Sequence, residues 1–202
     1  MNFIQHNELI NEDLYGCDKV KLECADLIIK KIIEETGVVG NAFDLGCGTG
    51  IYVQTLIDNA IPTIGIDINN TISEDMLNTD AFNLRRHDLG KPVCDLYEPR
   101  DLVISFETGE HIPNHEGLVF LQNVNDMAKK WIVMTCSPDK GKYHLNPQPM
   151  KYWVDGIEMY GDFKHKPYES LLMMEYFRKN ISLELGGFIW FKRDLMIFEA
   201  ES

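Results

Sequence analysis

Phe43-Asp44-Leu45-Gly46-Cys47-Gly48-Thr49-Gly50 is the stretch that decides the fold. An apolar run, Asn41–Leu45, leads into it, and a helical pattern, Ile51–Asn59, follows it. Glycines at such a strand-to-helix turn let the backbone turn sharply and let a ligand approach main-chain atoms. A dinucleotide-binding fingerprint needs its third glycine at the position of Ile51. The acidic Asp44 disfavours a pyrophosphate and suits a cationic ligand instead.

Short apolar runs alternate with helical patterns along the chain. Strands are predicted at Asn41–Leu45, Thr63–Ile68, Asn83–Arg86, Leu102–Phe106, Trp131–Thr135 and Leu195–Ala200. Helices are predicted at Asp18–Glu35, Ile51–Asn59, Ser73–Leu77, Glu116–Ala128 and Ser170–Phe177. The core-facing residues of the helix after the fourth strand are predicted to be Leu118, Leu121, Val124 and Ala128. This alternation predicts a doubly wound α/β fold with a mostly parallel sheet, and the final strand is expected at an antiparallel edge.

The composition narrows the class of protein. The chain has 202 residues, enough for one domain, and its 19 Lys plus Arg against 32 Asp plus Glu give a net charge of −13. Such a surface repels phosphate backbones, so a nucleic-acid partner is not expected. No apolar run reaches the length of a membrane span, and the start lacks a signal pattern. The five cysteines form no Cys-x-x-Cys pair. We expect a cytoplasmic protein without membrane insertion.

Two further carboxylates follow predicted strands. Asp67 ends the strand about 20 residues after the glycine loop, where a carboxylate accepts both hydroxyls of a ribose. NAD-binding proteins share this feature, so it indicates an adenosine ligand without deciding which. Asp88, at the end of the next strand, is positioned to accept the exocyclic amine of adenine, while Leu89 packs on the ring. A cap of its own loop is the alternative role for Asp88.

In this order and spacing, the chain resembles class I S-adenosylmethionine-dependent methyltransferases over roughly Asn41 to Ser137. The resemblance implies a Rossmann-like, seven-stranded sheet with a reversed last strand. It divides the single domain of residues 1–202 into an N-terminal lid and helix (1–37), a cofactor-binding core (41–137), and an acceptor loop with the sheet edge (138–202). It implies a cofactor site made by Asp44, Gly46, Gly48, Gly50, Asp67 and Asp88. We also expect Ile68, Leu89, Phe106 and, from an N-terminal lid before the first helix, Tyr15 at this site.

The segment after the fourth strand carries the candidate catalytic groups. His111 is the expected general base because the unperturbed pKa of imidazole lies near neutrality, and Glu110 is placed to orient it. The alternative is an exposed loop that enters a helix. Glu107, Glu110 and His111 would share one face of a helical turn. This Glu-x-x-Glu-His pattern is similar to that of the ubiquinone-biosynthesis O-methyltransferases, which implies a divalent metal; the metal is kept as an alternative to simple base catalysis.

The long loop after the fifth strand is the candidate acceptor site. His144, Asn146 and Gln148 alternate beside aromatic residues, which suits a hydroxyl-rich ligand. The run from His144 to Trp153 resembles a segment of small stand-alone methyltransferases encoded near glycosyltransferases in bacteria and large DNA viruses. That resemblance implies methylation of a sugar hydroxyl in a glycan, a second base candidate in His144, and association with glycan-assembly enzymes.

Other functions remain open at this point. Metal-assisted methylation of a phenol- or quinol-type small molecule is the first alternative. A non-catalytic cofactor- or partner-binding domain is the second, although every cofactor motif is intact. An NAD oxidoreductase lacks its third glycine. Base methyltransferases resemble one another in an Asn/Asp-Pro-Pro-aromatic motif, and Ser105-Phe106-Glu107-Thr108 lacks it.

Overall fold

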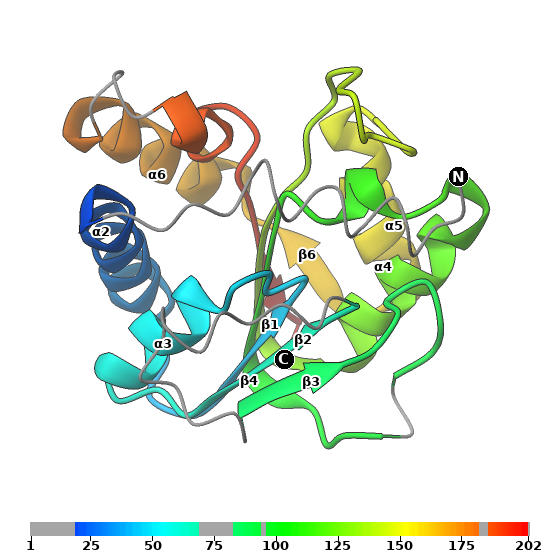
Figure 1. The fold of residues 1–202 in the computed structure, drawn as a ribbon, viewed down its shortest axis with the longest axis horizontal. Helices are drawn as coiled ribbons and strands as arrows, with labels where there is room; N and C mark the ends of the chain where they lie inside the picture. Colours follow the sequence, from blue (N-terminus) through cyan, green and yellow to red (C-terminus); the bar gives the residue numbers. More distant parts are fainter. Residues whose placement is uncertain (1–18, 69–82, 94–95, 182–185, 202) are drawn as a thin grey trace.

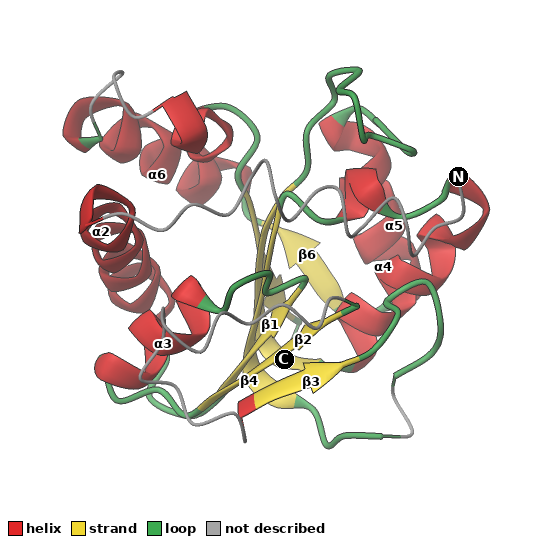
Figure 2. Cartoon of the chain, in the orientation of Figure 1, coloured by secondary structure: helices red, strands yellow, loops and turns green. Residues whose placement is uncertain are grey.

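The computed structural model describes residues 19–68, 83–93, 96–181 and 186–201. Within this part, one seven-stranded sheet runs through the middle of the molecule (Figure 1). Helices cover both of its faces: α2, α3 and α6 lie on one side, and α4 and α5 lie on the other (Figure 2). The arrangement is the three-layered α/β architecture that the alternation of strands and helices predicts.

The strand order is β3-β2-β1-β4-β5-β7-β6. Strands β1 to β5 are parallel, and β7 is antiparallel to both of its neighbours, β5 and β6. The predicted doubly wound sheet with a reversed last strand is therefore confirmed. The strands are β1 (Ala42–Leu45), β2 (Thr63–Asp67), β3 (Leu84–Arg86), β4 (Arg100–Phe106), β5 (Ala128–Thr135), β6 (Phe163–His165) and β7 (Met196–Ala200).

The described residues contain five α-helices, and the sequence pattern predicted all of them except α5. They are α2 (Lys19–Thr36), α3 (Ile51–Asp58), α4 (Gly117–Asp126), α5 (Met150–Tyr160) and α6 (Pro167–Asn180). Neither α5 nor β6 was predicted, because no helix or strand was assigned between the loop after β5 and Ser170. Of the residues predicted to face the core from α4, Leu121 and Val124 are buried, but Leu118 is 49% exposed and Phe120 is buried instead. Ala128 lies outside the helix, since it begins β5 and is half-buried there. The helix predicted at 73–77 lies outside the described residues.

Neighbouring residues of a strand pack into two separate hydrophobic cores, one on each face of the sheet. On β4, Leu102 and Ile104 pack with α2 and α6, while Val103 between them packs with α4 and α5. The same alternation holds on β7, because successive strand residues point to opposite faces of the sheet. A sheet buried on both sides explains why its central strands read as continuous apolar runs.

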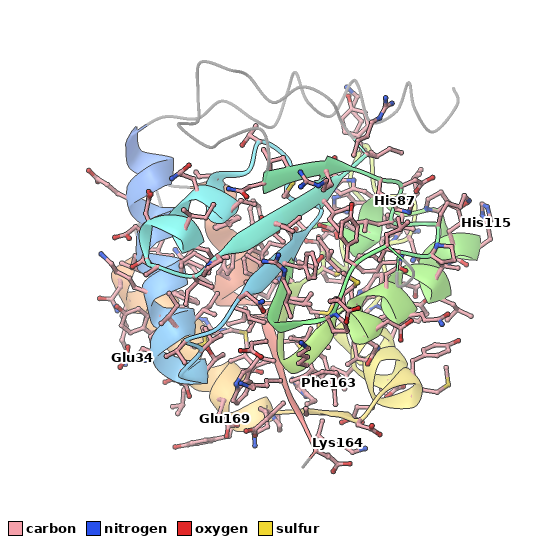
Figure 3. All side chains as sticks on the ribbon, turned by 90° about the horizontal axis from the view of Figure 1, so that it is seen from below. Glu34, His87, His115, Phe163, Lys164 and Glu169 are labelled. Carbon is pink, nitrogen blue, oxygen red and sulfur yellow. The ribbon has the colours of Figure 1, made fainter. Side chains whose placement is uncertain are left out.

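The parallel strands bring five loops to one edge of the sheet. Because β1 to β5 run in the same direction, the segments that follow Leu45, Asp67, Arg86, Phe106 and Thr135 all emerge at their carboxyl ends. From β1 the sheet continues through β2 and β3 on one side and through β4 and β5 on the other. Open α/β sheets bind ligands at such a switch point, which here lies between β1 and β4. Figure 3 shows the width of the sheet: His87, after β3, and Lys164, on β6, lie on opposite sides of the molecule.

Among the described residues, no helix has the length and apolar character that crossing a membrane requires.

Candidate active site at the carboxyl edge of the sheet

The glycine loop has the backbone that only glycine adopts readily. Gly46, Gly48 and Gly50 have φ angles of 85°, 52° and 80°, in the left-handed region. Gly46 also has no room for a side chain, since a Cβ there would lie 2.1 Å from Oγ1 of Thr108. The loop therefore packs directly on the segment that follows β4. This contact joins the predicted cofactor loop to the predicted catalytic segment.

Asp44 is a buried carboxylate beneath this loop. Its side chain is 1% exposed, and Oδ2 has no hydrogen-bond partner among the described residues. Burial, and then the charge of Asp67, raise the pKa of Asp44 well above its usual value. An unpaired buried carboxylate is costly, and proteins retain such groups mainly at functional sites. A cationic ligand group would provide the missing partner.

Asp67, the predicted ribose ligand, is bonded to the glycine loop. The amide of Gly48 donates to Oδ2 of Asp67 at 2.8 Å. The amides of Gly46 and Cys47 both donate to the carbonyl of Ile66, one residue earlier on β2. These bonds fix the loop after β1 to the end of β2, so the two predicted parts of the cofactor site are held as one unit.

The Asp88 loop lies beside them after β3. Oδ1 of Asp88 accepts the amide of Gly90 at 2.9 Å, so this residue does cap its own loop, as the alternative stated. Leu89 is 4% exposed and packs in the core on the α4 side. Its contact with an adenine ring stays a prediction. The loop is held from below by Asn123 of α4, which donates to the carbonyls of Leu89 and Lys91 and accepts the amide of Val93.

The remaining predicted cofactor residues differ in their surroundings. Ile68 is half-buried at the end of β2, and its carbonyl accepts Nε of Arg86. Phe106 is 8% exposed and stacks edge-on against Tyr52 and Phe191. Tyr15 lies outside the described residues.

The segment after β4 begins with a strained turn rather than a helix. Glu107 has a φ of 50°, which is uncommon for a residue other than glycine, and its amide donates to the carbonyl and hydroxyl of Thr135. A 3₁₀ helix, Gly109–His111, follows. Burial, and then the charge of Glu110, raise the pKa of Glu107, while burial raises that of Glu110. The two carboxyl groups therefore compete for ionisation in one small volume.

Three side chains from two loops form a possible cation-binding cluster. Glu110, His111 and His144 each offer one ligand atom, and these atoms all lie within 4.8 Å of one another. Glu110 is fully buried; its Oε1 accepts the amide of Ser137 at 2.9 Å, and its Oε2 has no partner among the described residues. Glu107, expected in this set, lies outside it because the turn at Glu107 breaks the helical spacing. His144 takes its place.

The hydrogen bonds of the two imidazoles fix their tautomers. His111 donates through Nδ1 to the carbonyl of Tyr143 at 3.0 Å, and His144 donates through Nδ1 to the carbonyl of Asp139 at 2.6 Å. A carbonyl only accepts, so Nδ1 carries the hydrogen in each neutral ring and Nε2 carries a lone pair. This arrangement, an Nδ1–H bonded to a backbone carbonyl, is common in histidines that ligate a metal or act as a base through Nε2.

The acceptor loop does not present all of its predicted polar groups. Asn146 is 1% exposed, and its backbone amide donates to the carbonyl of Glu110. Its Oδ1 accepts hydrogen bonds from the side-chain amides of Asn114 and Gln148. These bonds brace the loop from inside, while Nδ2 of Asn146 has no hydrogen-bond partner among the described residues. Its predicted role as a ligand for an acceptor stays a prediction. His144 and Gln148 remain half-buried. Trp153 is fully buried in the core.

Several residues of the site carry no motif in the sequence. Thr108 packs on Gly46, Asn123 holds the Asp88 loop, and Asp139 accepts the bond from His144. For Asn123, the signal in the sequence was a polar residue between the apolar residues of a predicted helix. The others depend on how two distant loops meet.

Comparison with known proteins identifies the fold. No family model and no curated protein sequence matches the chain. Solved structures do. A SAM-dependent methyltransferase from Archaeoglobus fulgidus superposes with a TM-score of 0.63 at 17% identity, over 96% of this chain and 99% of that one. The magnesium protoporphyrin IX methyltransferase of Synechocystis with bound SAH gives 0.60 at 15% identity, over 81% and 87%. The expected class I methyltransferase fold is therefore confirmed.

Proposed function

We propose that this protein, which has the class I methyltransferase fold, is an S-adenosylmethionine-dependent O-methyltransferase. One observation supports this most: Oδ2 of the buried Asp44 lacks a hydrogen-bond partner among the described residues, next to a glycine loop that is bonded to Asp67. A cationic amino-acid moiety suits Asp44, and the two hydroxyls of a ribose suit Asp67. S-adenosylmethionine carries both on one molecule.

The residues of the chain have separable tasks in such a reaction. S-adenosylmethionine, when bound, supplies an electrophilic methyl carbon on a sulfonium. Asp67 and the glycine loop hold the cofactor at the carboxyl edge, with Asp88 at the adenine. His111, with His144 beside it at 5.0 Å between ring centroids, presents Nε2 to take the proton from an acceptor hydroxyl as the oxygen attacks. The protein otherwise contributes alignment of the two reactants.

A divalent cation at Glu110, His111 and His144 would assist the same step. A carboxylate with two imidazoles is a donor set for Zn²⁺, Mn²⁺ or Fe²⁺, and a bound cation lowers the pKa of a hydroxyl that coordinates it. The buried Oε2 of Glu110 has no partner among the described residues, and both imidazoles carry their Nε2 lone pairs. The residues therefore fit a cation, and this is the second candidate mechanism.

For the acceptor we propose a sugar hydroxyl in a glycan. The loop beside the cluster supplies half-buried polar side chains, Tyr143, His144 and Gln148, rather than a purely apolar wall. Asn146, the third group that suggested this acceptor, is buried, and its Oδ1 is bonded within the loop. A phenol or quinol therefore stays the alternative, and it gains weight if the cation is required.

Activity assays separate these proposals. Purified protein is incubated with methyl-labelled S-adenosylmethionine and panels of oligosaccharides and of catechols or quinols, before and after exhaustive chelation. Label in a sugar supports the leading proposal, whereas label only in the phenolic panel replaces it with the alternative. A functional cation site is supported if chelation abolishes methyl transfer by the wild type and Zn²⁺ or Mn²⁺ restores it. The same ions should not restore transfer by the Glu110→Gln variant. Cofactor binding without transfer to either panel favours a non-catalytic domain.

A further inference from the structure

The loop that brings His144 to the cluster is organised around Asp139. The backbone carbonyl of Asp139 accepts Nδ1 of His144 at 2.6 Å and the amide of Gly141 at 3.0 Å. Its own amide donates to the hydroxyl of Ser137, the residue whose amide bonds Glu110. The position of Asp139 therefore determines where the imidazole of His144 lies and which tautomer it has.

Asp139 is in turn held by a residue far away in the sequence. Nη1 of Arg193 donates to Oδ2 of Asp139 at 2.8 Å. The same guanidinium bonds the carboxylate of Asp194, with Nε at 2.9 Å from Oδ1 and Nη2 at 2.6 Å from Oδ2. The side chain of Asp194 is 8% exposed, and the amides of both Arg193 and Asp194 donate to the carbonyl of Trp190. Arg193 thus bridges Asp139 and Asp194, and the Asp194 end of this bridge is buried just before β7.

We propose that Arg193 is a positioning residue: through Asp139 it holds His144 at the cluster with Glu110 and His111. This proposal rests on the cation site proposed above. The guanidinium is planar and directs its donors to two carboxylates at once, so it joins the exposed loop to a buried anchor. A lysine at this position keeps the charge but has one ammonium for both partners.

The ion pair of Arg193 with Asp139 affects the position of His144 rather than the global stability of the protein. The side chains of Arg193 and Asp139 are 42% and 67% exposed, and exposed ion pairs contribute little to folding. We therefore expect Arg193→Lys to shift the melting temperature by less than about 4 °C. The affinity for a cation should fall by about 10-fold, because outer partners of metal-binding histidines tune affinity on that scale.

The test uses Co²⁺, whose visible spectrum reports its ligands, titrated into the full chain. Four proteins are compared: the wild type, Arg193→Lys, His144→Ala and the double variant. Arg178→Lys, an exposed position in the last turn of α6, is the matched control. If Arg193 acts through His144, its substitution weakens Co²⁺ binding and alters the spectrum in the wild-type background but changes affinity less than about 2-fold in the His144→Ala background.

The other outcomes overturn the proposal in distinguishable ways. If the wild type binds no Co²⁺, the cation site itself fails, and the role of Arg193 at that site fails with it. If the wild type binds and Arg193→Lys binds equally well, the site stands and Arg193 does not position it. If Arg193→Lys weakens binding equally in both backgrounds, its effect is structural and does not pass through His144.

Discussion

The amide of Gly48 lies 2.8 Å from Oδ2 of Asp67, and this hydrogen bond joins the two strands that carry the proposed cofactor site. Gly48 follows β1, and Asp67 ends β2, its parallel neighbour. The bond places a carboxylate suited to a ribose against the loop suited to the amino-acid part of the same ligand. The site is thereby built before any ligand arrives, which lowers the ordering cost of binding.

Gly46 should not tolerate a side chain. Gly46→Ala puts a Cβ 2.1 Å from Oγ1 of Thr108 at a φ of 85°, so we expect a loss of about 2 kcal/mol or more of stability. Gly37→Ala is the control, because its φ is 61° but nothing lies within 4 Å of its Cβ. It should cost about 1 kcal/mol from backbone strain alone. Urea denaturation of both variants measures the difference, and equal losses would show that the Thr108 contact does not matter.

Asp44 should cost stability at neutral pH. Burial, and then the charge of Asp67, raise the folded pKa of this carboxyl well above its unfolded value, so the folded protein holds the proton more tightly than the unfolded chain does. The contribution of Asp44 to the free energy of unfolding is therefore most favourable below its unfolded pKa. This contribution is lost as the pH rises toward its folded pKa. We expect Asp44→Asn to stabilise the protein by about 1–3 kcal/mol at pH 7, and by progressively less toward pH 4.

Urea denaturation of Asp44→Asn across this pH range measures the effect. Asp162→Asn, at an exposed position, is the control and should show no such trend. The same Asp44→Asn substitution should weaken S-adenosylmethionine binding. A variant that is less stable at pH 7, or that binds the cofactor normally, would contradict the assignment of Asp44 as a ligand.

His111 should be needed for turnover and not for cofactor binding. We expect His111→Ala to lower kcat by at least about 100-fold, on the scale of general-base catalysis, and to change SAH affinity less than about 2-fold. His115→Ala is the control, because the side chain of His115 is 81% exposed. Normal turnover of His111→Ala on the true acceptor would remove His111 from the mechanism.

The extent to which the sequence predicted this structure follows the strength of each local pattern. Cys24, Ile28 and Ile32 recur at helical spacing within the helix predicted at Asp18–Glu35, and all three are buried in α2. The central strands are buried on both faces, so their apolar runs were clear. The three-residue edge strand β6 is too short to show a period of two, and α5 was hidden because it begins directly after the Pro-rich loop.

The site was less predictable where it depends on loops meeting in space. The proposed cofactor residues Asp44 and Asp67 lie at the ends of β1 and β2, and Asp88 follows β3, so the sheet topology alone brings them to one edge. His144 is 33 residues from His111, and nothing in the local sequence says that the two imidazoles meet. Alternation in the same loop suggested that Asn146 faces a ligand, but a loop without a regular period does not reveal which side chains turn inward.

The most direct test of the central claim is calorimetric titration of the protein with S-adenosylmethionine, SAH and NAD, before and after Asp67→Ala. We predict micromolar binding of the two sulfur ligands and none of NAD. The substitution should weaken binding by about 10–100-fold, because it removes the carboxylate that would accept hydrogen bonds from the ribose hydroxyls. Absence of binding by both sulfur ligands, or affinity unchanged by Asp67→Ala, would contradict the account.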